Sequence, residues 1–406
     1  MKRKILKDIL FFVFFLLVME IVIPTNVRAQ DWWDEDFDRG KRSSFDIRYN
    51  RVEGLYAGIK IKKEYWRKRY PLKPFLYGFG GYSLASKEFQ YQAGFEKGFL
   101  FGEYRLAFGG ETHKMIDTPD RWIIPDHENS LAAFLLKEDF QDFFLREGSS
   151  GYIVQSFTRV FSLSMAYYYD VFDSLKKNTN WSLFGGKKYF RENPAMPSGV
   201  IRSGVVRLVV DSRNSTRKTT SGWYIQIEGE HAGNELKGDF NFDRLLVDIR
   251  RYQPLGFEAG VDFRIRVGTS HGRLPWQRSY HLGGLSTLRA FPYKAFPAGP
   301  VNPGGNRMVL AQLEYRMGNQ DLPEELDMGI LDYFNLILFT DVGWVGNAGI
   351  EHGFFKGFDG LSFSNMKSDV GIALANRSGS MRFQIARRTD TSRKPFVFSF
   401  RINRPF

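Results

Sequence analysis

The chain has 406 residues, with 57 lysine and arginine residues against 45 acidic ones, a formal net charge of +12 and no cysteine. Without cysteine, the sequence excludes disulfide scaffolds, thiolate metal sites and cysteine nucleophiles. The mean hydropathy of −0.33 excludes a bundle of membrane helices, but it is compatible with a membrane β-barrel, whose alternating strands hide their apolar band in any average.

The N-terminus has the features of a secretory signal. Basic residues precede an apolar stretch at 9–18, and residues 27–29 form a cleavage site with apolar or small side chains at positions −3 and −1. The apolar stretch is shorter than the ~20 residues that a membrane helix needs. We therefore predict a signal peptide over 1–29, with a retained anchor helix as the alternative. A short acidic and aromatic segment, 30–43, follows it.

From residue 44 onward the sequence repeatedly alternates between apolar and polar residues. In 261–267 every odd position is apolar and every even position is charged, and 396–403 places large apolar side chains at every even position. A period of two indicates strands with one apolar and one polar face. Sixteen strands are predicted, an even number that suits a closed barrel. Their ranges are 44–50, 54–66, 74–85, 88–97, 101–110, 151–170, 179–188, 200–210, 222–231, 242–252, 256–268, 306–317, 334–343, 368–376, 380–388 and 395–404.

A soluble β-sandwich would show the same alternation, so further features must decide between the two. The polar faces of several strands are fully charged, as in the wet lumen of a barrel, and aromatic residues gather near strand ends, for example at 167–169. Such aromatic girdles mark the membrane interfaces of barrels. We expect the terminal Phe406 to close the barrel at the end of an alternating last strand, an arrangement that resembles the ending of bacterial outer-membrane barrels. The prediction is an all-β fold, a single transmembrane antiparallel β-barrel of about 16 strands over 44–406.

Two inserts interrupt the strands. Residues 121–147 mix apolar and acidic side chains in the manner of an amphipathic helix, with Asn129 or Ser130 as its N-cap. We expect this helical insert to pack on the barrel rim or to lie in the membrane interface; a partner-docking or gating element is the alternative. Residues 269–305 form a long loop rich in glycine and proline, and loops of this length are usually functional or disordered.

The long loop contains the most informative motif, HLGGLSTLRAF at 281–291, with Gly283 and Gly284 at its start. The segments that follow it in order are AQLEYR at 311–316, FTDVG at 339–343, DVGI at 369–372 and RINRPF at 401–406. This ordered set resembles the C-terminal barrel of the BamA/TamA-type outer-membrane protein assembly factor superfamily, also called the bacterial surface antigen family. The resemblance is strongest over 200–406.

The resemblance implies that the loop after the eleventh strand folds back into the barrel. Arg289 would be its tip arginine, Phe291 its tip aromatic residue and Asp341 the acid on the inner wall, with Glu314 as a second candidate acid. A guanidinium group binds a carboxylate through two parallel hydrogen bonds, which can fix such a loop. Ala290 stands where the family has glycine, so the tip is expected to bend differently if this position needs a positive φ. The alternative is that Arg289 is an ordinary solvated loop residue.

Enzyme chemistry is not expected. None of the six histidines shows the i, i+4 spacing of a helical zinc pair, and no Gly-x-Ser-x-Gly nucleophile elbow occurs. We therefore predict neither catalytic residues nor a metal nor a cofactor. The basic residues are spread over strands and loops, which suits lumen lining and contact with anionic lipid better than nucleic-acid binding.

The resemblance implies a role in inserting proteins into the outer membrane of a Gram-negative bacterium, or in moving polypeptides across it. An imperfectly paired seam between the first and last strands would present a strand edge to an incoming client. Family members usually carry N-terminal periplasmic POTRA domains, for which 30–43 leaves no room. The expected partners are therefore outer-membrane lipid, unfolded outer-membrane proteins and a separate periplasmic subunit. The alternatives are a passive or plugged solute pore and a structural surface antigen.

Overall fold

The computed structural model describes residues 43–406, except 217–218, 257, 298–303, 319–333, 378, 380, 391–394 and 405. These residues belong to one unit, Lys41–Phe406. The predicted signal peptide, 1–29, lies outside the described residues, and so does the segment 30–43 apart from its last residue.

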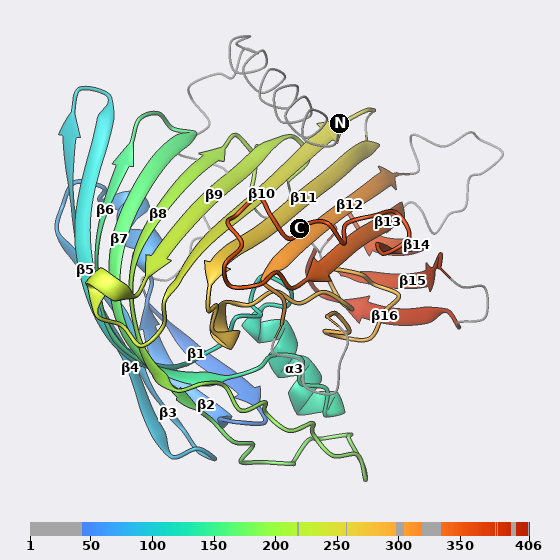
Figure 1. Ribbon diagram of the computed structural model, residues 1–406, viewed down its shortest axis with the longest axis horizontal. Coiled ribbons are helices and arrows are strands. Elements are labelled where there is room, and N and C mark those ends of the chain that lie inside the picture. Colours follow the sequence, from blue (N-terminus) through green and yellow to red (C-terminus); the bar gives the residue numbers. More distant parts are fainter. Residues whose placement is uncertain are drawn as a thin grey trace. The chain divides into compact units, whose positions relative to one another are not determined.

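The described residues form sixteen strands in one antiparallel sheet, and each strand pairs with its neighbours in chain order. The sheet curls round on itself (Figure 1), and the predicted all-β antiparallel barrel of 16 strands is confirmed. The strands are β1 (Ser43–Asn50), β2 (Gly54–Ile61), β3 (Phe75–Ser83), β4 (Glu88–Phe101), β5 (Tyr104–Asp117), β6 (Phe144–Ser156), β7 (Phe161–Ser174), β8 (Gly199–Asp211), β9 (Gly222–Ala232), β10 (Phe242–Pro254), β11 (Gly260–Gly272), β12 (Arg307–Met317), β13 (Phe334–Gly346), β14 (Lys367–Asn376), β15 (Arg382–Arg388) and β16 (Val397–Arg401). The helices are α2 (Lys63–Arg69), α3 (Asp126–Leu136), η1 (Asn234–Leu236) and η2 (Trp276–Arg278).

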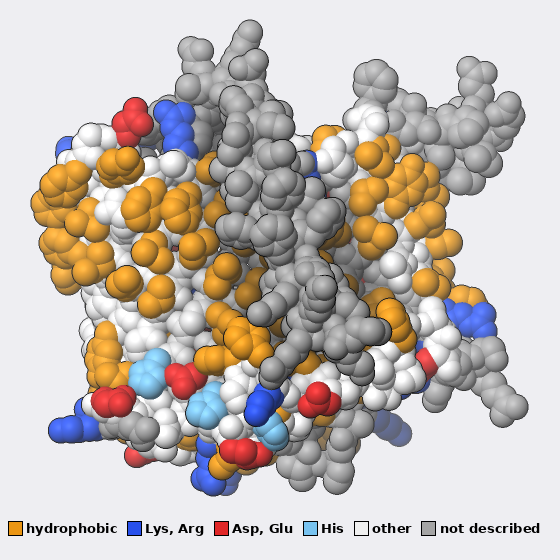
Figure 2. Space-filling view, turned by 45° about the horizontal axis from the view of Figure 1, so that its top comes forward, with side chains coloured by type: hydrophobic (Ala, Val, Ile, Leu, Met, Phe, Trp, Pro, Cys, Tyr) orange, Lys and Arg blue, Asp and Glu red, His pale blue; other side chains and the backbone are white. Residues whose placement is uncertain are grey.

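The two faces of the sheet have the polarity that a membrane barrel requires. On β11, Asp262 and Arg264 are buried whereas Ile265 between its charged neighbours is exposed, and on β16 Phe398 is 72% exposed whereas Arg401 is buried. Hydrophobic side chains accordingly cover much of the outer wall, and several charged side chains and histidines gather along one rim (Figure 2). Charges inside and apolar side chains outside are the reverse of a soluble sandwich.

Two predicted strands are corrected. The range 151–170 is not one strand: β6 and β7 reverse at 157–160, where the backbone N–H groups of Phe157 and Thr158 both donate to the carbonyl oxygen of Phe161. The range 179–188 contains no strand and lies in the long connection between β7 and β8. The number of strands is preserved because the division of one range offsets the loss of the other.

The helical insert is shorter than the range 121–147. Helix α3 begins at Asp126, with Pro125 in the N-cap position, so that neither Asn129 nor Ser130 caps it. The chain has returned to the barrel wall by Phe144, where β6 begins. Helix α3 lies beside β1 (Figure 1). Among the residues that the structure describes, no helix is long and apolar enough to cross a membrane.

The residues after β16 do not extend the last strand. Phe406 was predicted to close the barrel at the end of that strand, but β16 ends at Arg401. Phe406 is buried, with its ring 6.5 Å from that of Tyr252 on β10, and Arg404 binds Asp262 on β11 at 2.6 Å. Tyr252 and Asp262 are opposite each other in the β10–β11 register, so both face the lumen. The tail therefore turns inward.

Candidate functional site

The connection between β11 and β12, residues 273–306, folds around a glycine turn. Gly283 has a φ of +125° and Gly284 a φ of +72°, values that favour glycine. A Cβ atom on Gly283 would also lie 2.4 Å from the carbonyl oxygen of Pro292. The N–H of Gly284 donates to the carbonyl oxygen of Leu288 at 2.7 Å, which places Arg289 directly after a closed turn.

Arg289 is buried and bonded to the inner wall. Its Nε donates to Asp341 Oδ2 at 2.7 Å and its Nη2 donates to Asp341 Oδ1 at 2.8 Å, so the pair is bidentate. Its Nη1 donates to Glu314 Oε1 at 2.6 Å, and the guanidinium carbon lies 3.6 Å from the ring centroid of Phe339. The structure thus brings Arg289 together with both of its predicted acids, on β12 and β13.

A second arginine completes this group. Arg382 on β15 donates from Nη1 to Glu314 at 3.0 and 3.2 Å, so two guanidinium groups face the two carboxylates of Glu314 and Asp341. We call these four residues, Arg289, Arg382, Glu314 and Asp341, the tip cluster. Burial lowers the pKa of the Arg289 guanidinium, but Asp341 and Glu314 outweigh burial and hold that pKa above its ordinary value. Arg289 therefore keeps its positive charge in this buried site.

Phe291 anchors the apolar side of the loop tip. Its ring packs edge-on against Phe296 with centroids 5.3 Å apart. It belongs to a buried cluster with Leu282 and Leu288 from the loop and Leu310 from β12. The loop is thus held by an apolar contact as well as by the tip cluster.

Ala290 adopts an ordinary backbone conformation. Its φ is not positive, and its N–H donates to Asp369 Oδ2 at 3.0 Å. The condition for a different bend at the tip, a positive φ at this position, is therefore not met, and the position needs no glycine.

Replacing Ala290 by glycine is expected to lower the free energy of unfolding by about 0.4–1 kcal/mol, since glycine gains conformational freedom in the unfolded chain. The urea midpoint of the barrel reconstituted in lipid vesicles measures this change. A higher midpoint for Ala290→Gly would mean that the position is strained after all.

The loop is also tied to the helical insert. The Ser286 hydroxyl donates to the carbonyl oxygen of Ile123 at 2.8 Å, and Lys294 Nζ binds Asp120 at 2.8 Å and Asp142 at 2.6 Å. Burial raises the pKa of Asp120 more than Lys294 lowers it. For Asp142, Lys294 and nearby guanidinium groups outweigh burial and lower the pKa. Ion pairs therefore join the β11–β12 connection to the β5–β6 connection, which contains α3.

Helix α3 binds both end strands of the sheet. Glu128 in its first turn accepts bonds from Arg401 Nε at 2.5 Å and Nη2 at 3.1 Å, and from the N–H of Ile402 at 3.2 Å. Ser130, half a turn further on, accepts a bond from the N–H of Tyr49 on β1 at 3.1 Å. We call these contacts of Glu128 and Ser130 the α3 bridge. In the described part of the chain, no ladder joins β1 directly to β16.

The α3 bridge and the long loop meet at the hydroxyl oxygen of Ser286. Arg401 donates from Nη1 to the Ser286 hydroxyl at 2.9 Å, and the same hydroxyl donates to the carbonyl oxygen of Ile123. The side chains of Arg401 and Glu128 are 1% and 8% exposed. A movement of the long loop would therefore change the hydrogen bonds of Arg401 at the end of β16.

The sequence located only part of this site. It predicts Arg289, Asp341 and Glu314, which lie together in the structure. It does not predict Glu128 or Arg401. Arg401 does carry a signal, because it is the charged residue on the polar face of the last strand. The acidic residue in the first turn of a helix is normally explained by the helix dipole, so Glu128 gave no indication of its distant partner. No sequence spacing connects the two.

Comparison with known proteins gives one family and two relatives. The Omp85 superfamily domain matches residues 202–406. The "Outer membrane protein assembly factor BamA" of Nitratidesulfovibrio vulgaris is 27% identical over 190 residues, which are 44% of this chain and 22% of that protein. The crystal structure of BamA from Haemophilus ducreyi lacking POTRA domains 1–3 has a TM-score of 0.53 and 13% identity, and the match covers 89% of this chain and 70% of that one. The match thus spans less than a quarter of the curated relative's length.

Proposed function

Because the chain belongs to the Omp85 superfamily, we propose that this outer-membrane β-barrel takes part in the assembly of other outer-membrane proteins, helping unfolded polypeptides to insert into that membrane or to cross it. The observation that carries the proposal is that the two end strands are held by α3 and not by each other. Both bind α3 through the α3 bridge, and within the described residues no ladder joins one to the other.

The end strands are also short. β16 has 5 residues and β1 has 8, whereas β4 and β7 have 14 each. A short strand forms few backbone hydrogen bonds with a neighbour, and an unpaired strand edge can accept an incoming strand. A client strand could add to β1 or β16 once α3 moves away from them.

In this proposal the tip cluster has a structural role. The tip cluster joins the long loop to β12, β13 and β15, so that this part of the wall keeps its shape while the end strands exchange partners. No covalent step is required. Unfolded outer-membrane proteins are the proposed clients, and a separate periplasmic subunit is the proposed partner that delivers them.

The test uses the full chain in lipid vesicles and a urea-unfolded outer-membrane barrel as the client. We expect the client to fold about tenfold faster than in empty vesicles. Each backbone hydrogen bond contributes about 0.5–1.5 kcal/mol, and a barrier lowered by about 1.4 kcal/mol corresponds to a factor of ten. Equal folding rates, together with an unchanged set of outer-membrane proteins in cells depleted of this chain, would contradict the proposal.

A further inference from the structure

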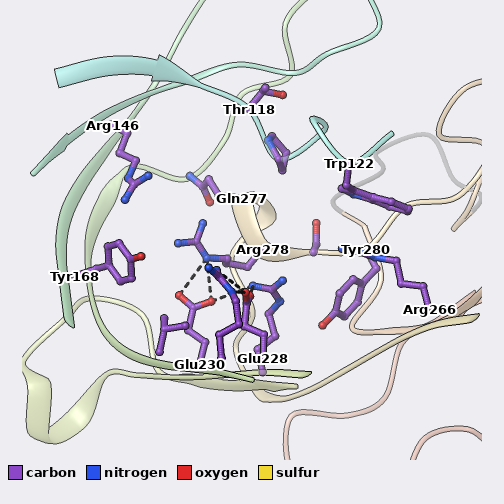
Figure 3. A pocket seen from close by; sticks show the side chains of 15 residues that line it. Thr118, Trp122, Arg146, Tyr168, Glu228, Glu230, Arg266, Gln277, Arg278 and Tyr280 are labelled. Carbon is purple, nitrogen blue, oxygen red and sulfur yellow. Dashed lines mark hydrogen bonds and ion pairs between the residues drawn. The ribbon is translucent and has the colours of Figure 1, made fainter. Parts of the chain in front are cut away.

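A cavity of about 390 Å³ lies inside the barrel, between its inner wall and the start of the β11–β12 connection (Figure 3). Its basic lining comes from five different elements and consists of Arg146 on β6, Arg207 on β8, Arg244 on β10, Arg266 on β11 and Arg278 on η2. Its acidic lining is Glu228 and Glu230, both on β9. The cavity is separate from the tip cluster and from the α3 bridge, since it shares no residue with either.

Positive charge exceeds negative charge in this lining. Glu228 binds Arg207 at 2.7 Å and Arg244 at 3.4 Å. Glu230 binds Arg244 at 3.0 Å and Arg278 at 3.1 Å. The fifth arginine, Arg146, binds Asp170 at 2.9 Å and Asp117 at 3.3 Å, neither of which lines the cavity. Among the lining residues alone, five arginines against two glutamates leave three positive charges (5 − 2). The field inside the cavity therefore favours an anion.

Arg266 shares its acid with two further cations. Its partner Asp248 also binds Arg264 at 2.7 Å and Arg250 at 3.0 Å. One carboxylate thus serves three guanidinium groups, of which only that of Arg266 lines the cavity.

Three of the arginines that line the cavity are not fully hydrogen-bonded within the protein. Within the described residues, the buried Nε atoms of Arg146, Arg244 and Arg266 have no hydrogen-bond partner. A buried donor without an acceptor is unfavourable, and arginine has no acceptor of its own. These three arginines stand on β6 and on the neighbouring strands β10 and β11, so their guanidinium groups reach the cavity from two parts of the wall. A tetrahedral phosphate, with oxygens in several directions, matches that arrangement better than a planar carboxylate.

Aromatic rings hold two of these groups in position. The guanidinium carbon of Arg266 lies 4.3 Å from the ring centroid of Trp122, and that of Arg146 lies 5.6 Å from the ring centroid of Tyr168. Cation–π contacts of this kind are attractive. They also restrict the side chains before a ligand arrives, which reduces the entropy lost on binding.

We propose that this cavity binds a phosphorylated ligand, either a soluble phosphate ester or the phosphorylated headgroup of a lipid. The volume leaves room for a small organic body beside the phosphate. The proposal rests on the cavity alone and does not depend on the assembly function.

Calorimetric titration of the full chain in neutral detergent with inorganic pyrophosphate tests the proposal. We expect binding that weakens with added salt and that acetate does not reproduce. Arg266→Gln is expected to raise the Kd about tenfold, equivalent to about 1.4 kcal/mol. Arg250→Gln is the matched control, because Arg250 binds the same Asp248 but does not line the cavity, and its Kd should equal that of the wild type.

The source of the phosphate is tested in nanodiscs with and without a bis-phosphorylated glycolipid. Displacement of pyrophosphate by that lipid supports the proposal with a headgroup as ligand, and retention of pyrophosphate supports it with a soluble ester as ligand. Absence of pyrophosphate binding by the folded wild-type chain at millimolar concentration would overturn the proposal. Equal weakening by Arg266→Gln and Arg250→Gln would overturn it as well.

Discussion

Replacing Arg289 by alanine is expected to lower the free energy of unfolding of the barrel by about 3–5 kcal/mol, the usual cost of removing one partner of a buried ion pair. The side chains of Arg289 and Asp341 are fully buried and that of Glu314 is 3% exposed. The variant would therefore leave carboxylate charge in the lumen wall without its main counter-charge. Arg382 remains beside Glu314, but Asp341 loses its bidentate partner.

The urea midpoint of the reconstituted barrel measures the effect of Arg289→Ala. Arg69→Ala, on the exposed surface of α2, is the control and should leave the midpoint unchanged. Arg289→Lys should fall between the two, because lysine keeps the charge but cannot form two parallel bonds. A midpoint for Arg289→Ala equal to that of the control would refute the structural role of the tip cluster.

Single-channel recordings of the same variants distinguish an assembly barrel from a solute pore. For a loop held in the lumen we expect low, flickering conductance in the wild type and larger openings in Arg289→Ala. A large and stable conductance in the wild type would instead favour the passive pore.

The second large effect is expected from Glu128→Gln. This variant keeps the size of the side chain but leaves the guanidinium of Arg401 without a counter-charge in a site where it is 1% exposed. At about 3 kcal/mol for a broken buried pair, the α3 bridge would open on the order of a hundred times more often. Amide hydrogen exchange should then rise at 45–50 and 397–402, because opening of a local unit exposes its N–H groups.

Glu138→Gln is the matched control for Glu128→Gln. Glu138 lies in the same connection but pairs with Lys188 on the surface, where both side chains are about half exposed, and exposed pairs contribute little. Exchange in both end strands should stay as in the wild type. If the two variants behave alike, the α3 bridge does not hold the end strands.

The barrel could be predicted from the sequence because its period-two pattern is local. The predicted strand over 151–170 was wrong for the same reason: the reversal at 157–160 contains no glycine, proline or asparagine, so that the alternation seemed to continue. The prediction for 179–188 was wrong because Trp181 and Leu183 alternate with Ser182 without belonging to a sheet, and both are exposed. Local periodicity cannot tell an apolar loop from a strand.

The candidate site, like the fold, could be predicted from the sequence only in part. Arg289, Phe291 and the acids Asp341 and Glu314 were found through motif resemblance, which supplies the missing spatial information. Glu128 and Arg401 belong to no motif and are 273 positions apart in the chain. Their pairing depends on the curl of the whole sheet, which no short segment encodes.

That separation has a consequence for the order in which the barrel folds. Contacts between residues far apart in the chain form late, because the entropy of closing the intervening loop must be offset first. Helix α3 is synthesised long before β16, so its Glu128 lacks its ion-pair partner until Arg401 arrives. The salt bridge can therefore form only when the last strand is in place, and a barrel that stalls before β16 keeps α3 bound to β1 alone.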